Sequence, residues 1–252
     1  KNKFSFHVNN KFQVNNFNLI SKINLEEFLL SNNFKINKIL PEIGKKIKFS
    51  NHKIELEYKK KALTIRGNGN VLLQKNNDEF IYSIQNNKNT LNFKTSLTIK
   101  KNPLKLKIIG YEKNLDNDLI LKVNGTKKLN NKIKFDLISM KEETNRFDLE
   151  DLILNEKFKI TDIKKAEINF LDNENNKNKF EIKAKDKEYY LIGTFFNANN
   201  IIENFIDNDD EKLDLFNKNF GLNVELDELF ISKDHILKDF NGKLSIKDQQ
   251  KF

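Results

Sequence analysis

The side chains that could carry out catalysis or bind a metal are few in this sequence. Its only imidazoles are His7, His52 and His235, which lie far apart in the chain, and none stands at a metal-ligand spacing such as H-x-x-x-H. Cysteine is absent, so neither a disulfide framework nor a cysteine-bound metal can form. We therefore expect each histidine to be an ordinary surface or turn residue, and we expect no metal site and no cofactor.

Acidic residues are numerous, but their arrangement does not identify a catalytic acid and base. The adjacent pairs Asp209-Asp210, Glu26-Glu27 and Glu142-Glu143 cannot be distinguished from solvated charges. The sequence has no G-x-S-x-G motif. The segment Gly67-Asn68-Gly69 lacks the helix start and the Lys-Ser/Thr of a phosphate-binding loop, so it predicts a hairpin turn. We predict that the chain is not an enzyme and has no catalytic residue.

The composition is that of a folded, basic chain. Of its 252 residues 38% are hydrophobic, with 22 Phe among them, which argues against disorder. An excess of 45 Lys+Arg over 36 Asp+Glu gives a net charge of +9, which would suit an anionic partner. The lysines are scattered among carboxylates, and the aromatic residues alternate in phase with Ile and Leu as core residues do. We therefore interpret the charge as a solvated basic surface and expect no nucleic-acid partner.

The longest regular pattern runs from Ile54 to Ile109, where apolar and polar residues alternate. A period of two places one set of side chains on a single face of an extended strand. Polar breaks predict tight turns, because Asn and Gly tolerate the positive φ angles of hairpins. These breaks are Gly67-Asn68-Gly69, Asn76-Asn77-Asp78, Asn86-Asn87-Lys88, Lys101-Asn102-Pro103 and Asn124-Gly125. The prediction is a mostly β fold, a long twisted antiparallel meander with one or two short helices.

We divide the chain into four parts and expect them to form one continuous β architecture. They are residues 1–50 with N-terminal strands and a short helix, 51–195 with the meander, 196–219 with a helix and a linker, and 220–252 with C-terminal strands. The first helix is predicted at Ile39 to Gly44, with Pro41 in its first turn. The second is predicted from Asn197, because Ile201, Ile202 and Phe205 recur at helical spacing.

The chain is expected to be a piece of a larger protein. It begins with Lys1 rather than Met, and no apolar run approaches the ~20 residues of a membrane-spanning helix. Any signal or membrane anchor would then lie outside it.

A long antiparallel sheet of this kind has one continuous apolar face, and the predicted helices are too few to cover it. Two sheets could cover each other as a sandwich with a dry core. Otherwise the sheet curls, and its apolar interior becomes open to hydrophobic ligands.

The order of several short motifs resembles a known family. They are Leu40-Pro41, Gly67-Asn68-Gly69, Phe80-Ile81-Tyr82, the run from Tyr190 through Gly193 to Ile201-Ile202, and the segment from Val224 to Leu244 that ends in Asn241-Gly242-Lys243-Leu244. In the AsmA-like C-terminal region of bacterial envelope proteins of the YhdP and TamB type, a strand ending in Gly leads into a short helix with an Ile-Ile or Leu-Ile pair. A loop and further strands ending at a Gly follow. Most of this chain is similar to that region.

The resemblance implies lipid transport. Members are anchored in the inner membrane and extend through the periplasm as a twisted β structure, whose hydrophobic groove lets phospholipid acyl chains move between the inner and outer membranes. Its partners would be those acyl chains and, through the parent protein, both membranes. The candidate groove residues are Ile54, Leu56, Leu63, Ile65, Leu91, Phe93, Leu104, Leu106, Leu121 and Phe135. The alternative is a structural or adhesive β module of a cell-surface protein, closed as a sandwich and without lipid transport.

Overall fold

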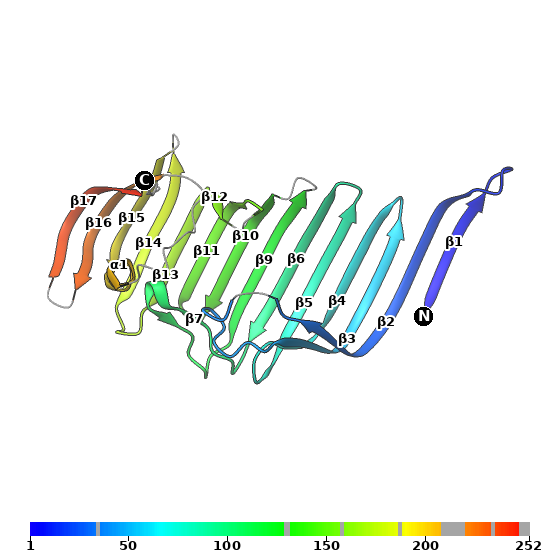
Figure 1. The fold of residues 1–252 in the computed structure, drawn as a ribbon, viewed down its shortest axis with the longest axis horizontal. Coiled ribbons are helices and arrows are strands. Elements are labelled where there is room, and N and C mark those ends of the chain that lie inside the picture. Colours follow the sequence, from blue (N-terminus) through cyan, green and yellow to red (C-terminus); the bar gives the residue numbers. More distant parts are fainter. Residues whose placement is uncertain are drawn as a thin grey trace.

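The chain folds as one large sheet. The computed structural model describes residues 1–33, 36–128, 132–156, 159–185, 188–207, 220–232 and 235–246. Among these residues the main sheet has 15 strands, which lie side by side in a single layer (Figure 1). Neighbouring strands pair antiparallel, apart from the parallel pair β15 and β16. The prediction of a mostly β, mostly antiparallel fold with short helices is confirmed.

The strands follow one another across the sheet almost in chain order. The path runs from β1 through β6, then β9 to β11 and β13 to β17, with β12 paired to β11 beside it. Their bounds are β1 Asn2–Val8, β2 Val14–Ser31, β3 Lys46–Lys59, β4 Ala62–Leu72, β5 Asn77–Asn87, β6 Thr90–Ile99, β9 Leu119–Lys128, β10 Ile133–Glu142, β11 Asn145–Leu154, β12 Ile160–Asp162, β13 Lys165–Leu171, β14 Lys177–Lys185, β15 Glu188–Asn197, β16 Phe220–Ser232 and β17 His235–Ile246. The sheet thus passes through all four predicted parts, and β3 crosses the division at residue 50.

Four short elements lie outside this sheet. Strands β7 (Lys105–Leu106) and β8 (Tyr111–Glu112) pair with each other, and the 3₁₀ turn η1 (Lys107–Ile109) joins them. The helix α1 (Asn199–Asp207) confirms the helix predicted from Asn197. The side-chain oxygen of Asn197 accepts a hydrogen bond from the Asn199 N–H at 3.1 Å, which satisfies a free donor at the helix start. Most of the predicted linker, residues 208–219, lies outside the described residues.

Two predicted turns are wrong, because their glycines lie inside strands. Gly67 lies in β4, where a Cβ atom would stand 2.4 Å from the ring of Tyr82, and Gly125 lies in β9, where a Cβ atom would stand 2.4 Å from the Lys134 carbonyl oxygen. The hairpin between β3 and β4 instead turns at Lys60-Lys61, whose φ angles of 51° and 65° are those of a type I′ turn. These glycines are there for close approach and not for chain reversal.

Three further predictions are also wrong. Residues 37–42, which include Pro41, form turns and not a helix. Beyond Pro103 the alternating run leaves the main sheet, because β6 pairs directly with β9. The strand that would end at Gly193 according to the family resemblance continues instead, as β15, to Asn197.

Residues 36–45 and 100–118, which we call the cover, pack over one end of the sheet. Leu40, Leu104 and Tyr111 of the cover join a buried cluster with sheet residues such as Leu119 and Phe170. The two parts of the cover are tied together by the Lys105 N–H, which donates to the Ile39 carbonyl at 2.9 Å. Figure 1 shows β7 and α1 in front of the lower part of the sheet. A second, smaller buried cluster is formed by Leu152, Ile163 and Ala166 on β11 to β13, and Phe135 packs against it.

A buried polar group attaches the cover to β10. The Tyr111 hydroxyl donates to Glu142 Oε2 at 2.7 Å, and the Asn114 N–H donates to Glu142 Oε1 at 2.8 Å. Tyr111 and Glu142 are 1% and 2% exposed. Burial, followed by the hydrogen bond to Glu142, raises the pKa of Tyr111 far above its usual value. The tyrosine therefore stays a neutral donor that satisfies a buried carboxylate.

A second set of buried polar residues joins the cover to Asp78 of β5. Lys113 is 2% exposed, and its Nζ donates to the carbonyls of Lys100 and Asn114 at 2.6 and 2.7 Å. Burial lowers the pKa of Lys113, and it raises the pKa of the neighbouring Asp78 carboxyl. Asp78 accepts hydrogen bonds from the Lys100 N–H and from Asn102, which is fully buried.

Replacing Gly125 with alanine should destabilise the sheet. The new methyl group would overlap the Lys134 carbonyl oxygen, which the ladder holds in place, so we expect Gly125→Ala to lower the free energy of unfolding by about 1–3 kcal/mol. Gly221→Ala is the matched control, because its nearest neighbour is the flexible Lys243 side chain at 3.3 Å. Urea unfolding of both variants measures the difference, and equal midpoints would contradict the close approach at Gly125.

Removing the Tyr111 hydroxyl should loosen the cover. Tyr111→Phe leaves the buried Glu142 carboxylate with one donor fewer, so we expect the free energy of unfolding to fall by about 1.5–3 kcal/mol. In Tyr190→Phe the lost bond is a 3.3 Å contact to the partly exposed Glu188, and the change should stay within about 0.5 kcal/mol. Similar losses in the two variants would show that the Tyr111 hydrogen bond does not hold the cover.

Candidate functional site

The pairing of the strands shows which side chains lie on each face of the sheet. Directly opposed residues of neighbouring strands share a face. One such row contains Leu56, Ile65, Ile84, Phe93 and, across Gly125, Phe135, and we call the side that bears it the apolar face. The adjacent row points the opposite way and contains polar and charged residues; we call its side the polar face. The alternation of apolar and polar residues in the sequence therefore gives the sheet one apolar face and one charged face.

The ten candidate groove residues fall into three groups. Seven lie on the apolar face beyond the cover, each half-buried, and we call this set the lane: Ile54, Leu56, Leu63, Ile65, Leu91, Phe93 and Phe135. Leu121 lies on the same face but packs against the buried cluster, so it marks the border with the cover. Leu104 and Leu106 belong to the cover itself, and Leu104 is only 3% exposed. Their segment leaves the main sheet, so these two residues border the lane from the cover and do not lie within it.

An aromatic cluster lies on the apolar face between the lane and the covered end. Phe49 and Phe80 have ring centroids 6.2 Å apart, and His52 and Tyr82 have theirs at 5.7 Å. Burial raises the pKa of Tyr82. Gly69 provides the space, since a Cβ atom there would stand 2.5 Å from the His52 ring. This cluster was not predicted, although Gly67-x-Gly69 and Phe80-x-Tyr82 alternate with the same period on facing strands.

One of the three histidines departs from the expectation of a surface or turn residue. His52 lies within β3, is 1% exposed, and its Nε2 is 2.9 Å from the Asn70 carbonyl oxygen. It is buried because its ring packs among the aromatic side chains. His7 and His235 are exposed, as expected, and His235 Nδ1 contacts the Ser232 hydroxyl at 2.8 Å.

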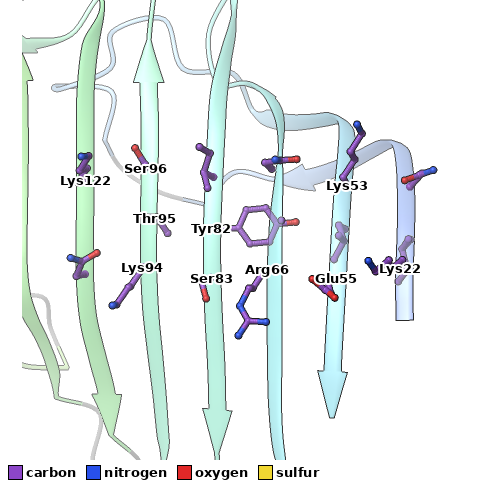
Figure 2. Close-up of a pocket in the computed structure, with 17 residues that line it drawn as sticks. Lys22, Lys53, Glu55, Arg66, Tyr82, Ser83, Lys94, Thr95, Ser96 and Lys122 are labelled. Atoms are coloured by element: carbon purple, nitrogen blue, oxygen red, sulfur yellow. The ribbon is translucent and has the colours of Figure 1, made fainter. Parts of the chain in front are cut away.

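The polar face contains a shallow hollow of about 710 Å³ over β2 to β9. Figure 2 shows the cationic side chains that line it, which come from different strands: Lys22, Lys53, Arg66, Lys94 and Lys122. Within the described part of the chain, Glu55 is the one carboxylate among the lining residues. Five of the 45 Lys and Arg residues therefore lie together in this hollow, which the scattered positions of the lysines in the sequence do not indicate.

The described residues contain no group of three or more His, Asp or Glu side chains that could hold a metal ion. In the same residues, no helix is long and apolar enough to cross a membrane. No protein-family model matches the chain, and neither does a curated protein or a solved structure.

Proposed function

We propose that the lane binds phospholipid acyl chains, and that the chain is a segment of an AsmA-like periplasmic protein that carries phospholipid between the inner and outer membranes. One observation supports this most. The sheet is a single layer, and on β3 to β6 the apolar side chains beyond the cover and the aromatic cluster stay half-buried, as at Ile54, Leu63 and Ile65. A closed sandwich would bury these side chains under a second sheet.

The length of the lane suits a lipid tail. It crosses six neighbouring strands from β3 to β10, and at ~4.8 Å per interval that is roughly 24 Å. One acyl tail spans about half of the ~30 Å hydrocarbon core of a bilayer. A tail laid across the strands would therefore contact apolar side chains along its whole length, and each buried methylene contributes about 0.8 kcal/mol.

The cover gives the lane a side wall. Leu106 packs against the same buried cluster as Leu97 and Leu121, which are the sheet residues bordering the lane. The polar end of a lipid would have to lie beyond the lane, since the lane offers apolar surface without a catalytic or metal-binding group. Because only the acyl tail would be bound, the lane would accept phospholipids with different headgroups, as transport of bulk phospholipid requires.

Ile65 of the lane and its cross-strand neighbour Ile84 on the apolar face should be needed for lipid binding. We expect Ile65→Gln with Ile84→Gln to lower the phospholipid bound per protein by about tenfold, because it removes apolar area from the lane centre. The control is Ile81→Gln with Ile120→Gln, the same change at two exposed isoleucines of the polar face. Native mass spectrometry of the 252-residue chain, expressed into a bacterial periplasm and purified without detergent, counts the bound lipid.

The measurement is accompanied by circular dichroism and by uptake of fluorescent phosphatidylethanolamine from vesicles. A folded wild-type chain that carries no lipid and takes up none would refute the proposal and favour a structural or adhesive β module. Equal loss of lipid in the lane variant and in the control would show that binding does not depend on the apolar face.

A further inference from the structure

The cations that line the hollow have few carboxylate partners. On β11 to β15 three cations are paired with nearby carboxylates, Arg146 with Asp148, Lys165 with Glu167 and Lys183 with Glu181. In the hollow, Arg66 has only a 3.9 Å contact to Glu57. Lys22, Lys53, Lys94 and Lys122 make no side-chain ion pair with any other described residue. The hollow thus holds an excess of positive charge, with five cationic side chains and one carboxylate, Glu55, among its lining residues.

The cations of the hollow form an ordered array. Lys22, Arg66 and Lys94 belong to one ladder row across β2, β4 and β6, so they recur at every second strand, about 10 Å apart. Lys53 and Lys122 belong to the other polar row, which lies two residues along the strands. An extended ligand that crosses the strands would meet a cation at regular intervals.

Neutral hydrogen-bonding groups lie between the cations. Asn68, Ser83, Ser96 and Asn124 line the hollow, and none makes a side-chain hydrogen bond to another described residue. Ile81, 57% exposed, lies among them. Tyr82 points to the apolar face, where its ring covers Gly67, so the polar face of the hollow has no aromatic platform.

We propose that this hollow binds an acidic polysaccharide, lying across the strands with its carboxylates toward the lysines. Serine and asparagine side chains suit sugar hydroxyls, and Ile81 can contact the C–H face of a ring. Single-stranded nucleic acid would require aromatic side chains for base stacking, which the hollow lacks. A peptide would require partners for its backbone, and the sheet's own N–H and C=O groups here are used in the ladder.

The hollow acts independently of the lane, since the two lie on opposite faces of one layer. We expect a fluorescent oligogalacturonate to bind the 252-residue chain, with neutral dextran fragments of equal length not binding. Affinity should fall steeply between 50 and 300 mM salt, because exposed charges are screened. Lys53→Gln with Lys94→Gln and Lys122→Gln should weaken binding roughly tenfold, a modest loss because each exposed ion pair contributes little.

Two controls separate the hollow from general charge. Lys141→Gln with Lys177→Gln and Lys185→Gln removes the same charge from exposed lysines of the polar face outside the hollow, and its affinity should stay within about twofold of wild type. Glu55→Gln removes the carboxylate from the hollow and should strengthen binding. An equal loss in both triple variants, no binding at 50 mM salt, or tighter binding of oligothymidylate or poly-glutamate than of oligogalacturonate would overturn the proposal.

Discussion

The packing of the cover on one end of the apolar face determines what the rest of the sheet can do. A single-layer sheet with an apolar side must bury that side or leave it open to another apolar partner. The cover closes only one end, and it is held there by the hydrogen bond from Tyr111 to Glu142 of β10 and by the hydrogen bonds that Asp78 of β5 accepts from the Lys100 N–H and Asn102. The part left open therefore has a fixed border, at which Leu121 separates buried core from exposed lane.

The strand pleat keeps the two proposed activities apart. Neighbouring residues along one strand, such as Ile65 and Arg66, point to opposite sides, so lipid tails and an anionic polymer would never compete for the same surface. The two proposed binding surfaces account for why apolar residues lie on one face of the sheet and charged residues on the other. A long sheet with two usable faces can connect a lipid-carrying side with a side that contacts a charged matrix.

Much of the fold could be predicted because the alternation of side chains is local information. It identified seven lane residues on one face, but it failed for Leu104 and Leu106, because the choice of β9 as the partner of β6 depends on distant residues. It failed at Gly67 and Gly125, where the glycine accommodates a neighbour rather than a turn. The hollow could not be predicted, because Lys22, Arg66 and Lys94 lie far apart in the sequence. Only the register of the paired strands brings them together.

The most direct test of the lipid lane is site-specific photocrosslinking. The chain has no cysteine, so a single cysteine can carry a benzophenone label either at Ile65 in the lane or at Ile81 on the polar face. After expression in the periplasm, labelling and irradiation, mass spectrometry identifies any attached phospholipid. Our account predicts a phospholipid adduct from position 65 and none from position 81. Adducts in equal yield from both positions, or from neither, would contradict it.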